Sequence, residues 1–557
     1  MKKFISVIMA ICLAVLTMTP AFARDLTRDS DRTSELPTIL IAGDGEHIYY
    51  DNDTRRMRLE SVFTDVFDEN EEFSAEEHSA KDIAESIYNV VKPMLFEGVL
   101  FGKWDNYYQA IQTEVSELYD PILLDGNGDP KGDSGIWQGR KDENVYNTVH
   151  NRTNGTDGRY KWDAYHFWYD WRLDPLQIAD ELHESIQAIK AVTDKDQVNL
   201  LTRCLGTSVV FAYIAKYGTE DIHGWGIDGC TSNGAEFISD ALTGDFDIDG
   251  NSLARYLSGY NFGTEQPSLQ VASDLFSLLE NSGVLDGMSL PLRLTIYNKI
   301  ETGVISALAL STAFTMPCYW ALVSADKFDI AMENVFGPEG SRKRQDYAGL
   351  IEKIDNYHNE VGLRLDDILL GAKADGINIG IVSKYGTNIV PIIKNGDIVS
   401  DSFASVTSSS FGATTSTLGR TLPDEYIAQR VSEGLGAYIS PDRQIDASTC
   451  LFPDYTWFLK GALHTDWVKG ETDLLMDVVD AETQLTCDTS QFSRFLVFSY
   501  DDDAVYTMTA DNCRTENWDD DAVLPDNTIK GRLTAYFRSL FNFMRSFFSF
   551  IVSAFGN

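Results

Sequence analysis

Residues 197–208 read QVNLLTRCLGTS, and this stretch decides the fold. Gln197–Thr202 is a short apolar run of the kind that forms a buried strand. A sharp turn around Cys204 follows it, and Thr207–Tyr217 is compatible with a helix. A strand that passes directly into a helix is the building unit of a mostly parallel sheet.

The same alternation continues on both sides of this stretch. Leu36–Ile41 predicts a strand that ends in a glycine turn, Pro175–Val192 has helical periodicity, and Ile377–Lys384 predicts a further strand. We therefore expect an α/β fold with a mostly parallel central sheet and helical cap insertions. The expected divisions are a signal peptide at 1–23, a core of 36–60, 160–240 and 372–480, a helical insertion at 61–159, a helical cap at 241–371, a β-rich extension at 481–527 and an amphipathic helix at 528–557.

The turn at Cys204 has the context of a nucleophile elbow, with cysteine at the position where serine is usual. Such a turn projects the nucleophile clear of the sheet, and the small Gly206 lets the helix approach closely. The backbone N–H of Leu205 would face a developing oxyanion, and the helix N-terminus stabilises a thiolate. The alternative interpretation is a small buried cysteine in an ordinary strand-to-helix turn.

A histidine late in the chain is the candidate base. Hydrolases with this elbow place nucleophile, acid and base in that order along the chain. Of the eight histidines only His464 follows His358, and it lies after an apolar run and a glycine. His464 is therefore the predicted base.

Two carboxylates follow the 377–384 strand and compete for the role of the acid. Asp401 lies in the segment SDSFASVTSSSFGAT, whereas Asp397 lies within Asn-Gly-Asp, which is typical of a tight turn. We favour Asp401 and keep Asp397 as the alternative.

The motif YDWRL at Tyr169–Leu173, the elbow some thirty residues later and the strand with its glycine loop at Ile39–Gly45 together resemble the lecithin:cholesterol acyltransferase and lipase group of the α/β-hydrolases. The resemblance implies the α/β-hydrolase fold and a second oxyanion N–H from Gly45. It also implies that Asp170 and Arg172 form a structural ion pair. The family's serine is replaced by Cys204, and Thr202 replaces the first glycine of the elbow motif.

The predicted activity is hydrolysis of carboxylic esters or acyl lipids through a thioester on Cys204, with His464 oriented by Asp401. A lipid acyltransferase that uses the same three residues is one alternative. A catalytically inert secreted binding protein that keeps the fold is the other. No cofactor is expected.

The N-terminus has the pattern of a cleaved signal peptide: Lys2 and Lys3, an apolar run to Leu16, and Ala21-Phe22-Ala23. We therefore expect a secreted or cell-surface protein that begins at Arg24. Its six remaining cysteines contain no CxxC motif, so structural zinc is not expected. A disulfide between Cys487 and Cys513 remains open.

Charge sets further limits on partners. The chain of 557 residues carries 85 acidic and 45 basic side chains, a net charge of −40, and has no sustained basic stripe. Such a surface repels phosphate backbones, which excludes nucleic acid as the expected partner. Acidic turns at 244–251 and 125–129 lack the glutamate that completes a calcium loop, so no metal is assigned. The oligomeric state stays open.

The C-terminal segment 532–555 has apolar residues at helical spacing, many of them phenylalanine, with Arg538 and Arg545 on another face. One interpretation is a helix that lies on a lipid surface. The other is a final helix packed against the body of the protein.

Overall fold

The computed structural model describes residues 35–43, 48–50, 55–57, 103–136, 165–245, 297–389, 398–417, 419–500, 502–513 and 536–542, with single helical positions at 89, 92, 93, 97, 101, 278, 544 and 545. The predicted signal peptide, Gly45 and Asp397 lie outside the described residues. So do the turn 246–251 and most of the cap between 246 and 296.

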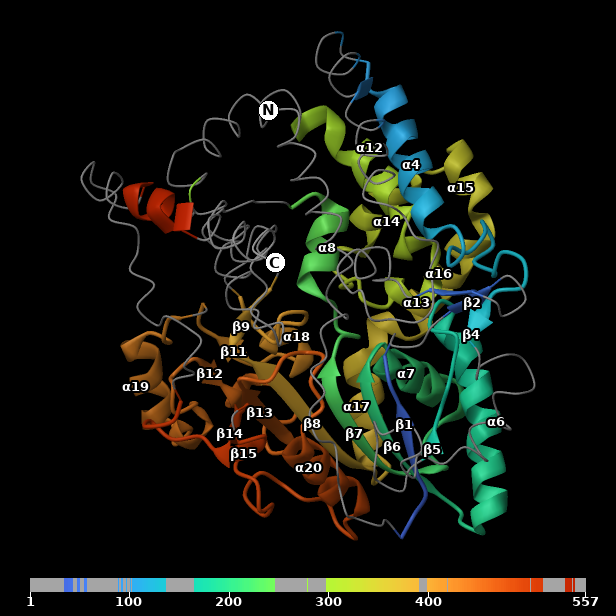
Figure 1. Cartoon of the computed structure of the whole chain (residues 1–557). Coiled ribbons are helices and arrows are strands. Elements are labelled where there is room, and N and C mark those ends of the chain that lie inside the picture. The colour runs from blue at the N-terminus through green and yellow to red at the C-terminus, as the bar shows by residue number, and fades with distance from the viewer. Residues whose placement is uncertain are drawn as a thin grey trace, which may run out of the picture.

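An eight-stranded sheet forms the centre of the described chain (Figure 1). Its order is β15-β14-β13-β8-β7-β6-β1-β5, and only the edge pair β14 and β15 is antiparallel. The strands are β1 (Thr38–Ile41), β5 (Tyr165–His166), β6 (Val198–Cys204), β7 (Ile222–Cys230), β8 (Asn378–Tyr385), β13 (Thr456–Lys460), β14 (Phe495–Ser499) and β15 (Ala504–Thr507).

The parallel strands are buried on both faces because helices cover each side. Leu200 of β6 belongs to the cluster beneath α6 (Pro175–Thr193) and α7 (Leu205–Tyr217), whereas its neighbour Leu201 packs toward α20 (Lys469–Asp480). The predicted α/β class with a mostly parallel sheet is confirmed. In the segment 481–527, where a β-rich extension is expected, β14 and β15 extend this same sheet.

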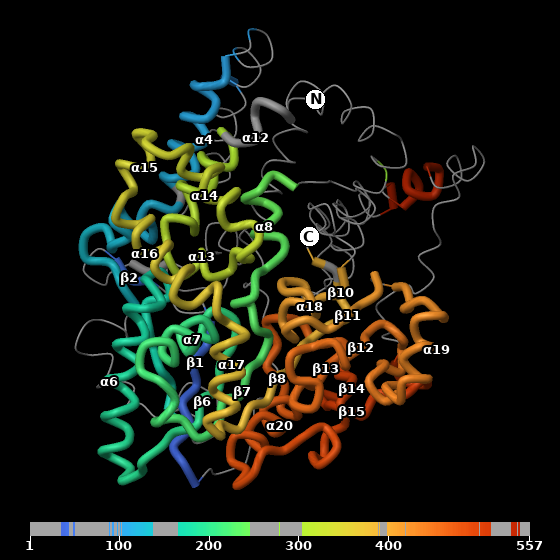
Figure 2. The backbone as a smooth tube through the Cα atoms, turned by 180° about the vertical axis from the view of Figure 1, so that it is seen from behind, coloured from blue at the N-terminus to red at the C-terminus, as the bar shows by residue number. Residues whose placement is uncertain are grey.

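Helices gather beyond the carboxyl ends of the strands (Figures 1 and 2). They are α4 (Asp105–Tyr119), α8 (Glu236–Thr243), α12 (Tyr297–Ala309), α13 (Pro317–Trp320), α14 (Phe328–Phe336), α15 (Arg342–Asp346) and α16 (Ala348–Glu360). The remaining helices are α17 (Leu365–Ala374), α18 (Val406–Ser409) and α19 (Asp424–Ser432), with 3-10 turns at Ala313–Thr315, Gly362–Arg364, Gly436–Tyr438 and Ala447–Thr449.

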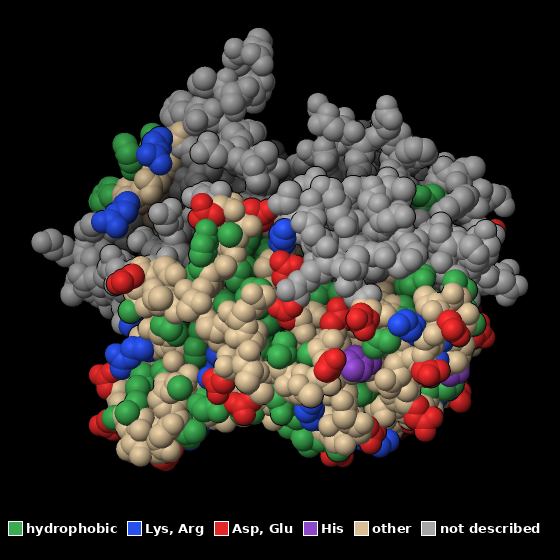
Figure 3. All heavy atoms as spheres, turned by 90° about the horizontal axis from the view of Figure 1, so that it is seen from below, with side chains coloured by type: hydrophobic (Ala, Val, Ile, Leu, Met, Phe, Trp, Pro, Cys, Tyr) green, Lys and Arg blue, Asp and Glu red, His purple; other side chains and the backbone are tan. Residues whose placement is uncertain are grey.

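In the described residues, three small sheets accompany the large one. They are β3-β2-β4 (Arg55–Met57, Ile48–Tyr50, Gly135–Ile136), β9-β10 (Thr387–Asn388, Val399–Ser400) and β11-β12 (Thr414–Thr415, Ile445–Asp446). None of the helices in the described part of the chain is long and apolar enough to cross a membrane. Over the described part of the face shown in Figure 3, acidic side chains are scattered and do not gather into one patch.

The disulfide left open between Cys487 and Cys513 is not formed. Both thiols are buried without a bridge, and they lie in different hydrophobic clusters. Cys487 donates to the carbonyl of Thr456 at 3.3 Å, and Cys513 donates to that of Ala510 at 3.5 Å. The packed sheet separates the two cysteines. This separation prevents a bridge, because a disulfide needs Cα atoms within about 7 Å.

Candidate active site

Cys204 occupies a strained turn between strand and helix. It is the last residue of β6, and α7 begins at the next residue, Leu205. Its φ of +49° and ψ of −127° lie outside the regions that a cysteine normally adopts. Such strain persists only where the surrounding packing imposes it, and it is common at functional sites.

Gly206 makes this tight turn feasible. A Cβ atom at this position would stand 2.2 Å from the carbonyl oxygen of Ile41 and 2.7 Å from that of Ala42. Only glycine therefore lets the start of α7 lie against the end of β1. Thr202, at the position of the family's first glycine, is fully buried, and its hydroxyl accepts the indole N–H of Trp225 at 2.9 Å.

The structure brings His464 and Asp401 together. His464 follows β13 in the segment 461–466, and its Nδ1 lies 2.7 Å from Oδ2 of Asp401. The other carboxylate oxygen of Asp401 accepts the backbone N–H groups of Phe403 at 3.0 Å and Ala404 at 2.7 Å. Asp401 is completely buried, so both of its oxygens are held by the protein.

Cys204 is the second polar neighbour of the His464 ring. The pKa of His464 is raised from 6.5 to about 10: burial alone lowers it, but the charges of Asp401 and Cys204 and hydrogen bonding to both outweigh burial. Asp401 occupies Nδ1, which leaves Nε2 as the nitrogen that can face Cys204. Nε2 is buried and has no hydrogen bond of regular geometry within the described chain. Phe403 stacks on the ring at a centroid distance of 4.8 Å.

The predicted oxyanion hole is described only in part. The N–H of Leu205 stands at the first turn of α7, and a Cβ atom on Gly43 would lie 3.7 Å from that nitrogen and 3.5 Å from the Cys204 sulfur. The loop after β1 therefore borders the nucleophile. Tyr169, the first residue of YDWRL, holds this loop by donating to the carbonyl of Ala42 at 2.6 Å. Gly45, the predicted second donor, lies outside the described residues.

Asp170 and Arg172 form a buried, two-point ion pair. Nε and Nη2 of Arg172 lie 2.8 and 2.6 Å from the two carboxylate oxygens of Asp170. Arg172 also donates to the carbonyl of Ile122 at 3.2 Å. The pair thus ties the YDWRL segment to the loop after α4.

A cluster of four ionisable residues lies beneath the His464 loop. Arg203, Asp228, Lys384 and Glu471 are buried, and Lys384 contacts the two carboxylates at 2.8 and 3.1 Å. Arg203 lies 3.4 Å from Asp228. The sequence patterns did not predict this cluster. A signal for it exists, because Arg203, Asp228 and Lys384 stand at or near the ends of three otherwise apolar strands.

Glu236 connects the start of α8 to the acid loop. Its carboxylate accepts the backbone N–H of Ser405 at 3.1 Å and also the Ser405 hydroxyl. Burial raises the pKa of Glu236, and the charge of Asp401 adds to this effect. Phe237 packs edge to face on Phe403, with centroids 4.9 Å apart, so the first cap helix contacts the residue that stacks on His464.

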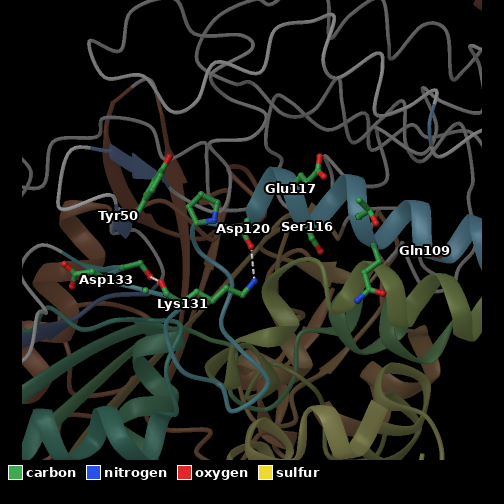
Figure 4. Close-up of a pocket in the computed structure, with 12 residues that line it drawn as sticks. Tyr50, Gln109, Ser116, Glu117, Asp120, Lys131 and Asp133 are labelled. Carbon is green, nitrogen blue, oxygen red and sulfur yellow. Dashed lines mark hydrogen bonds and ion pairs between the residues drawn. The ribbon is translucent and has the colours of Figure 1, made fainter. Parts of the chain in front are cut away.

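A polar cleft of about 820 Å³ lies elsewhere, between α4 and the segment 131–134 (Figure 4). Glu117, Asp120 and Lys131 are among its lining residues, and Lys131 pairs with Asp120 at 3.0 Å. None of Cys204, Asp401 and His464 lines it. The cleft is therefore separate from the chemistry of the thiol and imidazole.

Acidic side chains do not assemble into a metal site in the part of the chain that the structure describes. In the turn 125–129, one oxygen of Asp125 accepts the backbone N–H groups of Asn127 at 2.8 Å and Asp129 at 3.0 Å. The Asp125 carboxylate therefore stabilises the turn in which it lies.

Comparison with known proteins places the chain in no family. No family model and no curated protein matches it. One solved structure, titled "The crystal structure of Tle4-Tli4 complex", is similar over 65% of this chain and 77% of that chain, with 12% identity and a TM-score of 0.25. A similarity this low supports no conclusion about activity, which must be argued from the site.

Proposed function

We propose that the protein is an acyl hydrolase with an α/β-hydrolase fold, which cleaves carboxylic esters through Cys204, His464 and Asp401. The observation that carries the proposal is the position of Cys204 in a positive-φ turn, beside an imidazole that is hydrogen-bonded to a buried carboxylate. Strain, a neighbouring base and a group that orients the base are the requirements of an activated nucleophile.

The raised pKa of His464 refines the expected role of the histidine. An imidazole with a pKa of about 10 is a strong proton acceptor, so His464 takes the proton of the Cys204 thiol when the reaction begins and becomes an imidazolium beside a thiolate. The thiolate attacks the ester carbonyl carbon, and the N–H of Leu205 donates to the developing oxyanion. The imidazolium then gives its proton to the leaving alkoxide, which departs as the alcohol and leaves a thioester on Cys204.

The second half of the reaction reverses the proton path. The imidazole, now neutral, removes a proton from water, and the resulting hydroxide adds to the thioester carbonyl. Collapse of this intermediate releases the carboxylic acid and restores the thiolate and imidazolium. An alcohol in place of water would give transfer instead of hydrolysis, which is the acyltransferase alternative.

The test measures hydrolysis of p-nitrophenyl esters of short and long acyl chains. Wild type should turn over and, after an acid quench, carry an acyl adduct on the tryptic peptide 204–216. Cys204→Ala and His464→Ala should lose both. Cys230→Ala is the matched control, because Cys230 is a buried thiol paired with Cys204 in the β6–β7 register; its activity should stay within about threefold of wild type.

The outcomes separate the three functions. An acyl adduct that forms but is released only to added alcohols would favour the acyltransferase. No turnover and no adduct, together with equal alkylation of Cys204 in wild type and His464→Ala, would favour the inert binding protein.

We also propose that the substrate is met at a lipid surface through the C-terminal helical segment 536–542. Three apolar side chains spaced four and three residues apart, Phe537, Phe541 and Met544, are 62%, 68% and 49% exposed. In both ribbon views this segment lies apart from the described helices and strands (Figures 1 and 2). Arg538 and Arg545 are exposed beside the apolar face, a pattern that suits an anionic lipid surface.

Vesicle flotation tests this contact. Wild type should float with vesicles containing phosphatidylglycerol and less with pure phosphatidylcholine, because at 0.15 M salt screening limits repulsion by the distant acidic surface to about 8 Å. Phe537→Ser/Phe541→Ser should reduce binding at least about tenfold. Leu363→Ser/Val431→Ser, which removes two equally exposed side chains elsewhere, should not. Equal binding by the two double variants would contradict the proposal.

We propose in addition that the chain is exported with cleavage after Ala23. N-terminal sequencing of the protein recovered from the medium or periplasm of an expression host should begin at Arg24. A protein that keeps Met1 in the cell would contradict export.

A further inference from the structure

Arg203 reaches from the nucleophile turn to the base loop. It directly precedes Cys204, and its guanidinium donates to the backbone carbonyls of His464 and, at 2.8 Å, of Asp466. The side chain is 7% exposed, and it lies over the Trp467 ring at 5.2 Å. One side chain thus joins the residue before the thiol to the residue that carries the imidazole.

A second buried cation acts on the same loop. Lys384, at the end of β8, donates to the carbonyl of Asp466 at 2.5 Å. The side chain of Asp466 turns back on its own loop and accepts the N–H of Leu463 at 2.8 Å and the hydroxyl of Tyr500. The segment 463–466 is therefore fixed from two strands, β6 and β8, that lie on either side of β7.

The fold alone does not require these charges at this position. Burying four ionisable groups is costly, and apolar side chains of the same volume would hold strands and helix together at least as well. What apolar side chains cannot do is donate to the carbonyls of His464 and Asp466. A planar guanidinium with several donors at fixed angles fixes the position of both carbonyls, which a lysine ammonium does less well.

We propose that Arg203 is a positioning residue that sets the geometry between the Cys204 thiol and the His464 imidazole. The proposal rests on the proposed function, since it concerns the same pair. Arg203 touches no reacting atom. It acts through the backbone of the His464 loop, so its loss moves the imidazole relative to the sulfur while the turn at Cys204 remains in place.

The experiment measures alkylation of Cys204 by iodoacetamide between pH 5 and 10, by mass spectrometry of the peptide that contains residue 204. This readout needs no ester substrate. Alkylation follows the thiolate, and the thiolate depends on the neighbouring imidazolium. In wild type we expect faster alkylation at pH 7 than in His464→Ala, because the neighbouring imidazole accepts the thiol proton.

Three variants isolate the role of Arg203. Arg203→Met removes the donors and should slow alkylation at pH 7 about tenfold, with the profile moved to higher pH. Arg203→Lys keeps the charge and should fall between Arg203→Met and wild type. Arg494→Met is the matched control: Arg494 is also 7% exposed and also donates to two backbone carbonyls, of Pro453 and Ala437, but at the far side of β13. Arg494→Met should lower the free energy of unfolding and leave the pH dependence of Cys204 alkylation as in wild type.

Failure of the positioning role and failure of the proposed function give different results. Slow wild-type alkylation that does not depend on His464 would overturn the thiolate and imidazolium pair itself. Rapid wild-type alkylation with unchanged profiles in folded Arg203→Met and Arg203→Lys would overturn only the positioning role. If Arg203→Met does not fold, a wild-type profile in Arg203→Lys overturns the role and a shifted one supports it.

Discussion

His464 and Asp401 are joined twice, once through their side chains and once through their backbones. Nδ1 of His464 lies 2.7 Å from the Asp401 carboxylate, and the backbone N–H of His464 donates to the Asp401 carbonyl at 2.8 Å. The second bond holds the two loops in register whatever the state of the side chains. Changes to the carboxylate can therefore be made with the loop contact intact.

Asp401→Asn should separate catalysis from folding. Its oxygen can still accept the N–H groups of Phe403 and Ala404, but the amide presents N–H to His464 and favours the wrong imidazole tautomer. We expect kcat for p-nitrophenyl esters to fall about 10³- to 10⁴-fold while the protein stays folded, because the backbone bond between the two loops remains. Asp442→Asn is the control, since Asp442 is a buried partner of Lys460 outside the site; it should lower Tm and spare kcat. Comparable activity in the two variants would refute the assignment of Asp401 as the orienting acid.

Gly229→Ala should displace the imidazole. A Cβ atom at Gly229 would lie 3.3 Å from both Cε1 and Nδ1 of His464, and its φ of +53° adds strain of about 1 kcal/mol. We expect at least a tenfold loss in kcat. Gly132→Ala has a similar φ of +64° with nothing near the added methyl group, so it should show the strain in the free energy of unfolding without the loss in kcat. Equal kcat in the two variants would mean that the ring tolerates the contact.

The raised pKa of His464 predicts the sign of a pH effect on stability. A folded-state pKa of about 10 against 6.5 unfolded stabilises the fold fully below pH 6.5, and this contribution is lost as the pH rises through 10. The difference in free energy of unfolding between wild type and His464→Ala, measured in urea, should therefore shrink from pH 6.5 to pH 10.

His358 gives the opposite case for comparison. Burial lowers the pKa of His358, and Asp329 opposes burial only in part. The contribution of His358 to the free energy of unfolding is present above pH 6.5. It is lost as the pH falls through the lower pKa of His358 in the folded state. The difference between wild type and His358→Ala should thus grow with pH. Parallel trends in the two histidine variants would contradict the pKa assignments.

The buried charge cluster predicts unequal effects of two similar substitutions. Burial raises the pKa of Asp228, but Lys384 and Arg203 outweigh it and hold the net pKa below the ordinary value. Burial and the charge of Asp228 raise the pKa of Glu471, which favours its neutral form. Asp228→Asn should therefore cost about 3 kcal/mol in free energy of unfolding. Glu471→Gln, which replaces a neutral acid by a neutral amide, should cost about 1 kcal/mol or less. The reverse order in urea unfolding would place the charge on Glu471.

Local patterns predicted the elements that carry the candidate site. The apolar run 197–202 became β6, although the strand continues to Cys204, and the periodicity at 175–192 became α6. Chain order directed attention to His464 and Asp401, and the structure places these two side chains in contact. Elements of this kind follow from residues that are neighbours in sequence.

The charge cluster and the Tyr169 contact were not predicted, because recognising them requires the strand order. Arg203, Asp228 and Lys384 come together only when β6, β7 and β8 lie next to one another, and Glu471 reaches them from α20. A charge at a strand end usually faces water, so none of these residues alone indicates a buried cluster. The same limit applied to Cys487 and Cys513, whose separation depends on which cluster each one joins.

All six cysteines after the predicted cleavage site are buried and unbridged. Dithiothreitol therefore has no cross-link to break in this scaffold, so treatment with it before an assay should not weaken the fold. Inactivity that appears on storage in air and reverses with dithiothreitol would report oxidation of a reactive thiol, while Tm stays constant. In an exported protein, the catalytic rate would then depend on the redox state of the surroundings.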